Sequence, residues 1–178
     1  MKQALRLFAC LLQWLALTAL PGAGRAQADD HADISALLQS GQAAQALTLA
    51  EQRLTEHPRD PQLRFLRALA QTDAGEPERA IASFTELTQE FPELPEPYNN
   101  LAVLYARQNQ WDQARATLEM ALRANPGYAT AQENLGDIYA WLASQAYSKA
   151  MQLDANSAAS VRPKLALIRE LFGTGRAR

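Results

Sequence analysis

One spacing, 34 residues, recurs in three separate sets of positions along this chain. It separates three alanines, three prolines and the turn-forming residues Gly41, Gly75 and Asn109. The alanines and prolines are Ala46, Ala80 and Ala114, and Pro58, Pro92 and Pro126. A period of this length, with small residues in the middle of the unit and proline near its end, indicates an array of helical hairpins. Because one hairpin leaves an apolar face uncovered, such hairpins stack on one another and build an elongated surface.

These positions resemble the tetratricopeptide repeat (TPR) family. The stretch 95–128 has the family's residues at Tyr98, Leu101, Ala102, Tyr105, Ala114, Leu118, Ala121 and Pro126. Residues 61–94 form another repeat, although Arg67 and Gln71 stand where Leu and Tyr are usual. The first repeat is partial, and we expect its first helix to be short. The resemblance covers residues 33–155 and implies an all-α solenoid of about three and a half helix–turn–helix repeats.

The amino-terminal segment, residues 1–28, is not part of the repeats. Lys2 and Arg6 precede a stretch of about fourteen largely apolar residues, which is shorter than the roughly 20 that a membrane-spanning helix needs. Ala26 and Ala28 supply the small residues of a cleavage site, as in a secretory signal peptide. We therefore predict a bacterial periplasmic protein that is cleaved after Ala28 and keeps no stable membrane span. The alternative is that the segment is retained as a membrane anchor.

Loss of this segment changes the composition of the chain. Cys10 is the single cysteine among 178 residues, so the mature chain, residues 29–178, cannot form a disulfide or use a cysteine nucleophile. Some of the 17 basic residues also leave, whereas all 19 acidic residues remain. A mildly acidic chain without basic runs is a poor nucleic-acid binder. The chain has no sequence motif for catalysis or phosphate binding, and we predict no enzymatic activity and no cofactor.

The fourth repeat lacks the turn between its two helices. Leu135, Gly136 and Tyr139 follow the third repeat at the 34-residue interval. Ala143, which resembles the next small residue of the pattern, comes about five residues too early for a separate second helix. Apolar residues continue through the junction at steps of three and four. We therefore predict one helix over residues 130–153, roughly 36 Å long at about 1.5 Å per residue.

A helix of that length needs a surface to cover its second half. The sequence predicts a last helix over residues 161–172, with Leu165 and Ile168 on its apolar face and Pro163 in its first turn. Two covers are open: this last helix, or a second copy of the chain, which would make a homodimer. The domain organisation is then a signal peptide at 1–28, a TPR array at 29–155, and a capping helix with a tail at 156–178.

In the TPR family the first helix of each pair lines a concave groove that binds a partner. The resemblance assigns to this groove Asn99, Asn100, Val103 and Arg107 in the third repeat, and Glu133, Asn134, Asp137 and Trp141 in the fourth. Asn100 and Asn134 occupy the same position of successive repeats, and an amide can donate to and accept from a peptide backbone. The alternative is that these amides brace neighbouring helices. Trp141 either stacks on a ligand or covers the fused junction, and Trp111 is interpreted as a packing residue.

Charge limits the kind of partner. TPR domains that hold a terminal carboxylate use clustered Lys and Arg, whereas this groove has Arg107 alone and also contains Glu133 and Asp137. We expect it to prefer a neutral or basic segment. The implied function is a non-catalytic scaffold or adaptor that binds a protein or peptide partner in the cell envelope. The alternative is a self-associating protein that uses the long helix of the fourth repeat.

A metal site at the amino terminus is a third alternative. Cleavage after Ala28 would leave a chain that begins Asp29-Asp30-His31. A free amine with histidine at the third position can hold Cu(II) or Ni(II) in a square plane of four nitrogens. The site depends on that cleavage point, because a cut one residue away removes it.

Overall fold

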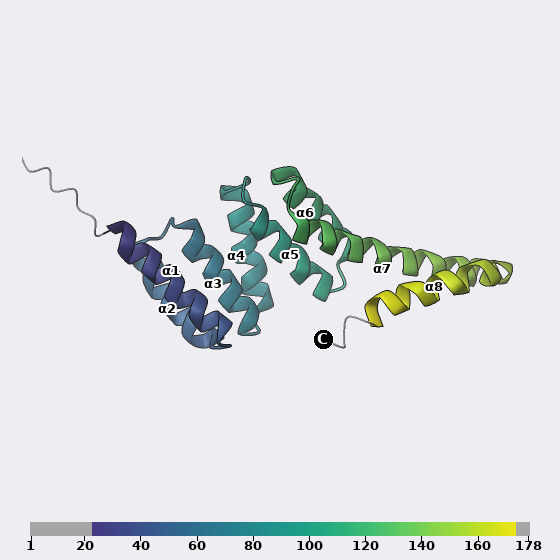
Figure 1. The fold of residues 1–178 in the computed structure, drawn as a ribbon, viewed down its shortest axis with the longest axis horizontal. Helices are drawn as coiled ribbons and strands as arrows, with labels where there is room; N and C mark the ends of the chain where they lie inside the picture. Colours follow the sequence, from purple (N-terminus) through teal and green to yellow (C-terminus); the bar gives the residue numbers. More distant parts are fainter. Residues whose placement is uncertain (1–22, 174–178) are drawn as a thin grey trace, which may run out of the picture.

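The computed structural model of the chain describes residues 23–173, with side chains from residue 30 to residue 172, and its regular elements there are all helices (Figure 1). In chain order they are α1 (Ala23–Gln39), α2 (Ala43–Glu56), α3 (Pro61–Asp73), α4 (Pro77–Glu90), α5 (Pro95–Arg107), α6 (Trp111–Ala124), α7 (Ala129–Leu153) and α8 (Ala158–Gly173), with a short 3₁₀ turn at Ala155–Ser157. Helices α1 to α6 pack as successive pairs, and α7 and α8 form a longer hairpin at the end of the array (Figure 1). The predicted all-α solenoid is confirmed.

The first helix is longer than the sequence suggests. Helix α1 has 17 residues, whereas α3 and α5 have 13 each. Residues 25–30 contain no proline or glycine, so no strong helix breaker stops the helix from extending toward the amino terminus. The expected short first helix is therefore wrong. The expected cleavage point after Ala28 falls inside α1, and cleavage there stays a prediction because residues 1–22 lie outside the described part of the chain.

The turns inside the hairpins follow the 34-residue spacing. Gly41, Gly75 and Asn109 have φ angles of 72°, 77° and 61°, in the left-handed conformation that ends many helices. In each turn the following residue donates its N–H to a carbonyl five residues back, as Glu76 does to Gln71 at 2.9 Å. Asparagine visits this conformation more readily than other residues with a side chain, which explains why it stands at 109 in place of glycine.

Alanines set the distance between the helices of each pair. Ala46, Ala80 and Ala114 are completely buried, and a larger side chain there would push the helices apart. The periodic prolines follow the ends of α2, α4 and α6, as expected, at Pro58, Pro92 and Pro126. The core is not one cluster but a succession of clusters along the array, each shared by neighbouring helices.

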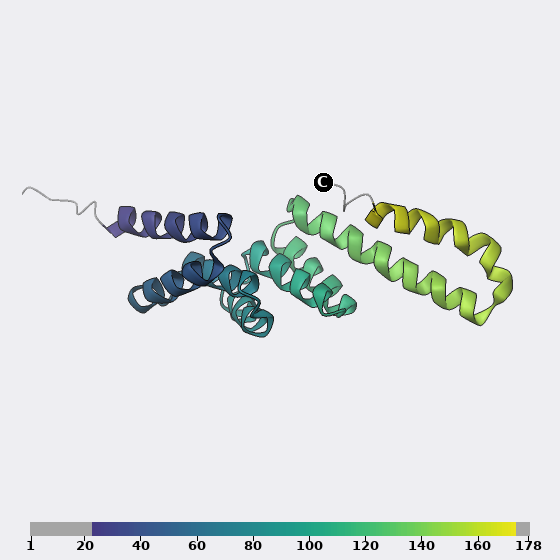
Figure 2. The same cartoon turned by 90° about the horizontal axis from the view of Figure 1, so that it is seen from below.

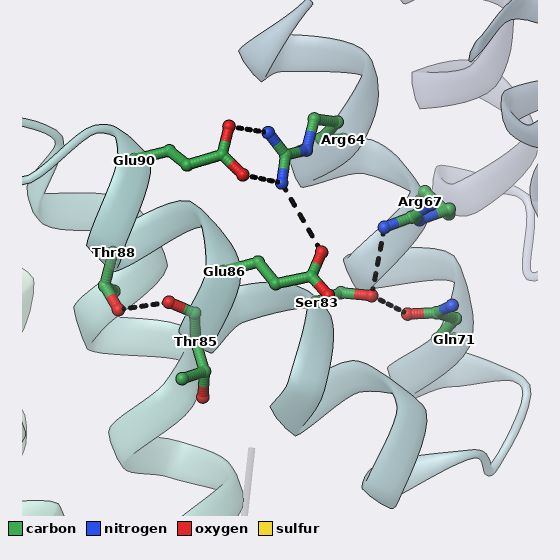
Figure 3. Close-up of polar contacts among 8 residues, drawn as sticks. All are labelled: Arg64, Arg67, Gln71, Ser83, Thr85, Glu86, Thr88 and Glu90. Atoms are coloured by element: carbon green, nitrogen blue, oxygen red, sulfur yellow. Dashed lines mark hydrogen bonds and ion pairs between the residues drawn. The ribbon is translucent and has the colours of Figure 1, made fainter. Parts of the chain in front are cut away.

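The core between α3 and α4 contains Arg67 and Gln71, which stand where Leu and Tyr are usual in the family (Figure 3). Gln71 is 3% exposed and accepts a hydrogen bond from the Ser83 hydroxyl at 2.8 Å. The same hydroxyl accepts a bond from Arg67 Nη2 at 3.3 Å, while Arg67 Nε has no partner among the described residues. Burial lowers the pKa of Arg67. The departures from the family pattern thus form one polar bridge between the helices.

Arg64 links the same two helices beside this bridge (Figure 3). Its Nη1 and Nη2 donate to the two carboxylate oxygens of Glu90 at 2.6 and 2.9 Å, and Nη2 also reaches Glu86 at 3.4 Å. The hydrogen bonds that Arg64 donates to Glu90 raise the pKa of Arg64 and outweigh its burial. This two-pronged geometry is the strong form of an arginine–carboxylate pair.

The fourth repeat is a single helix, as predicted. Helix α7 has 25 residues without a break, about 37 Å at the usual rise. Helix α8 runs back along α7 (Figure 2), and its Val161 and Leu165 are buried. The last helix of the same chain therefore packs on the far half of α7.

Helix α8 begins earlier than predicted. The Asp154 carboxylate accepts a hydrogen bond from the N–H of Asn156 at 2.9 Å, and the chain enters a helical turn at once. Because α8 starts at Ala158, Pro163 lies inside the helix and not in its first turn, and that expectation is wrong. Proline has no N–H, so α8 lacks one backbone hydrogen bond at this point.

Candidate peptide-binding groove

Residues of α5 and α7 line a hollow at the surface of the array. Its volume is about 400 Å³. It brings together five of the residues that the sequence assigns to a groove: Val103, Arg107, Asn134, Asp137 and Trp141. The other lining residues are Ala102, Ala106, Trp111, Leu118, Ile138 and Phe172. We call this feature the α5–α7 hollow.

Two tryptophans form one wall of the α5–α7 hollow. The rings of Trp111, at the start of α6, and Trp141, in α7, are stacked with centroids 3.8 Å apart and planes 20° apart. Trp141 reaches this position because α7 continues straight where the earlier repeats turn. It therefore covers the fused junction and lines the hollow at once. Trp111 packs, as interpreted from the sequence, but it also lines the hollow, which the sequence did not indicate.

The charges of the hollow are Arg107 and Asp137, and the rest of the lining is mostly apolar. Both charged side chains are exposed. Neither forms a hydrogen bond or an ion pair with another residue in the described part of the chain. Glu133 is also exposed and lies one helical turn before Asp137, outside the lining. A ligand would therefore meet an apolar surface with unpaired charges of both signs beside it.

Asn134 is paired with Asn99, not with Asn100. Its Nδ2 donates to Oδ1 of Asn99 at 2.8 Å, and Asn99 is 6% exposed. Asn100 donates instead to the carbonyl of Glu96, within its own helix, at 2.9 Å, and it does not line the hollow. Asn99 and Asn134 brace α5 against α7, as the alternative interpretation has it.

His31 interacts with the start of α3. Its Nε2 lies 3.0 Å from Oδ2 of Asp60. The other carboxylate oxygen of Asp60, Oδ1, caps α3 by accepting hydrogen bonds from the N–H groups of Gln62 and Leu63 at 2.8 and 3.1 Å. Burial opposes ionisation of Asp60, but these hydrogen bonds and His31 outweigh it and lower the pKa of Asp60. Within the described residues, no group of three His, Cys, Asp or Glu side chains is placed to hold a metal. The amino-terminal metal site stays a prediction, because it depends on cleavage after Ala28.

Between residues 23 and 173, no helix combines the length and the apolar character that crossing a bilayer requires.

Family comparisons identify the repeat. Two models of the tetratricopeptide repeat match the chain, one at residues 32–95 and one at residues 71–142. The chloroplastic tetratricopeptide repeat domain-containing protein PYG7 of Arabidopsis thaliana is 47% identical over 47 residues. The matched segment is 26% of this chain and 16% of PYG7, so the chain spans only a small part of that relative.

Solved structures share the fold. The thermophilic TPR protein TTC0263 of Thermus thermophilus has a TM-score of 0.63 and 26% identity, with 83% of each chain covered. The Sgt2 TPR domain of Aspergillus fumigatus has a TM-score of 0.61 at 18% identity, over 66% of this chain and 79% of that one. The second TPR domain of human RPAP3, in complex with the HSP70 peptide SGPTIEEVD, has a TM-score of 0.57 at 17% identity, over 65% and 97% of the two chains.

Proteins built from this repeat generally act as scaffolds for protein–protein interactions and generally not as enzymes. The spacing of 34 residues, the left-handed turns at the ends of the first helices and the family matches agree over residues 32–142. This chain belongs to the tetratricopeptide repeat family.

Proposed function

We propose that this protein is a non-catalytic interaction scaffold of the bacterial cell envelope, and that it binds a segment of a partner protein in the α5–α7 hollow. The observation that supports the proposal is the hollow itself. It joins stacked tryptophan rings and aliphatic side chains to the unpaired charges of Arg107 and Asp137. Concave, mostly apolar sites with a few polar groups are the usual form of a binding site.

The partner anchors itself in the hollow by an apolar side chain. Burial of one large apolar side chain stabilises a complex by about 1.5–3 kcal/mol, which suits a modest and reversible interaction. Charge then fixes the orientation of the bound segment, since a basic group of the partner pairs with Asp137 and an acidic group with Arg107. The hollow lacks the cluster of basic residues that a terminal carboxylate requires.

The proposed location in the envelope has its support in the amino-terminal sequence. Lys2 and Arg6, the apolar stretch after them and the small residues Ala26 and Ala28 have the order of a secretory signal peptide. Amino-terminal sequencing of the protein from the periplasmic fraction tests this. A terminus at Asp29 would agree with export and cleavage, whereas a retained Met1 in a membrane pellet would show an anchor.

Photo-crosslinking in the cell tests the hollow. A photoreactive amino acid replaces Asp137, and a matched probe replaces Gln113, an exposed residue of α6 that does not line the hollow. We expect the probe at Asp137 to capture one discrete envelope protein and the probe at Gln113 to capture none. Identification of that protein by mass spectrometry would then name the pathway.

A hollow-filling substitution makes the experiment specific. Ala106→Trp places a large side chain in the lining, whereas Ala116→Trp adds the same side chain at an exposed position of α6. The first should reduce capture at least tenfold, and the second should leave it unchanged, with circular dichroism as the control for folding. Capture that survives Ala106→Trp would reject the hollow as the binding site.

A second candidate function is self-association through the α7–α8 hairpin. Leu153 and Leu167 are 75% and 66% exposed, so the hairpin presents large apolar side chains that a second copy of the chain could cover. Analytical ultracentrifugation over a range of concentrations distinguishes the two candidates. A dimer that Leu167→Glu dissociates would favour self-association, and a monomer at every concentration would exclude it.

A further inference from the structure

The end of α8 lies at the α5–α7 hollow. Helix α8 returns along α7 toward the repeats (Figure 2), with Val161 and Leu165 buried near its beginning. Its last large side chain, Phe172, lines the hollow together with residues of α5, α6 and α7. Phe172 is nevertheless 40% exposed, so the hollow is occupied only in part. An apolar side chain from this same chain therefore already stands where a partner's side chain would enter.

The sequence after Phe172 has the charge that suits the edge of the hollow. Residues 173–178 read Gly-Thr-Gly-Arg-Ala-Arg and contain no acidic residue. Asp137 and the nearby Glu133 are exposed, and in the described part of the chain neither is paired. Six residues span up to about 20 Å when extended, whereas one helical turn along α7 is only about 5.4 Å. Phe172 and Asp137 line the same hollow, so Arg176 and Arg178, four and six residues after Phe172, are within reach of the carboxylate of Asp137.

We propose that residues 172–178 are an intramolecular ligand of the α5–α7 hollow, with Phe172 as the apolar anchor and Arg176 and Arg178 paired with the acidic groups of α7. The proposal rests on the proposed function, because it gives the same hollow a ligand from within the chain. It also specifies the partner, which must present a large apolar side chain followed by basic residues in order to displace the tail.

The tail is suited to exchange with a partner. A segment tethered beside its site has an effective concentration of roughly millimolar, so weak contacts are sufficient to hold it. Exposed ion pairs are individually weak and are screened by salt. A partner that fills the hollow more completely than the half-exposed Phe172 therefore displaces the tail, and raised salt weakens the arginine contacts.

The test uses protein expressed from the full sequence of 178 residues. It measures whether changes in the tail alter the surroundings of the hollow. The indole N–H resonances of Trp111 and Trp141 report on the hollow in a ¹⁵N–¹H spectrum. We expect Phe172→Ala and the double change Arg176→Ala with Arg178→Ala to shift both resonances. Leu167→Ala is the matched control, since Leu167 is an exposed residue of the same helix outside the hollow, and it should shift neither.

A synthetic peptide with the sequence of residues 171–178 supplies the second measurement. It should bind the Phe172→Ala chain at least tenfold more tightly than the unaltered chain, because the unaltered tail competes for the same site. Bound peptide should also return the two indole resonances toward their original positions. Equal affinity for the two chains, or tail variants that leave the indole resonances unmoved, would overturn the proposal.

The outcomes separate this proposal from the proposed function. If the peptide competes as expected while the probe at Asp137 captures no envelope protein, the tail is a ligand of the hollow and the scaffold function fails. If the probe captures a partner while the tail variants change nothing, the scaffold function holds and the intramolecular ligand is rejected.

Discussion

Nδ2 of Asn134 donates a hydrogen bond to Oδ1 of Asn99 at 2.8 Å, and this contact joins the first helices of two successive repeats. Asn134→Ala should lower the free energy of unfolding by about 1–3 kcal/mol, because it leaves the nearly buried oxygen of Asn99 without a donor. Asn100→Ala is the matched control and should cost less than about 0.5 kcal/mol. Urea unfolding of both variants measures the difference, and equal losses would contradict the bracing role.

Replacing one residue of the polar bridge between α3 and α4 should stabilise the protein. Arg67→Leu removes a half-buried guanidinium that has an unpaired Nε, and the bond from Ser83 to Gln71 remains. We expect it to raise the free energy of unfolding by about 0.5–2 kcal/mol, in the range of other stabilising substitutions. Arg64→Leu should instead lower it by about 1 kcal/mol, because it breaks the two-pronged pair with Glu90. Loss of stability in both variants would show that Arg67 contributes favourably.

Two glycines should respond in opposite directions to the same substitution. Gly136 lies inside α7 and an added Cβ meets nothing within 4 Å, so Gly136→Ala should stabilise the protein by about 0.5–1 kcal/mol. Gly75 has φ of 77°, and Gly75→Ala should destabilise it by about 1–2 kcal/mol through backbone strain. Thermal unfolding compares the two. Stabilisation by Gly75→Ala would show that the left-handed turn is not required.

Stability should fall in acid partly through Asp60. The folded chain holds the pKa of Asp60 below its ordinary value, so the carboxylate contributes fully above that ordinary value, about 4. The contribution is lost as the pH falls through the lowered pKa of the folded state. Asp60→Asn keeps a capping oxygen but does not titrate. Between about pH 5 and pH 2, the unaltered protein should therefore lose more stability than the variant, and parallel losses in thermal unfolding would exclude Asp60 as a cause.

The features that the sequence predicts well are those that depend on neighbouring residues. The turn at Gly41 and the fused helix α7 follow from local backbone preferences, because a glycine ends a helix and a missing turn continues one. The length of α1 is harder to predict, because residues 25–30 suit both a cleavage region and a continued helix.

The features that cannot be predicted from the sequence depend on packing between elements that are distant along the chain. Asn100 and Asn134 share a position in the repeat, but residues one period apart are not the ones that touch across neighbouring helices, and Asn134 meets Asn99 instead. Phe172 could not be assigned to the hollow from any motif, since its position depends on the direction in which α8 returns. The repeat spacing predicts which residues occupy equivalent positions. Which side chains touch depends on how the neighbouring helices are oriented.

Helix α7 belongs to two structures at once, since its first half completes the repeat array and its second half is the spine of the hairpin with α8. An unbroken helix transmits tilt along its length as a rigid rod does. A rotation of the first half of α7 would therefore also move the far tip of the hairpin. Because the turn is missing, the helix that lines the hollow is also the helix that supports the hairpin, and the two are mechanically joined.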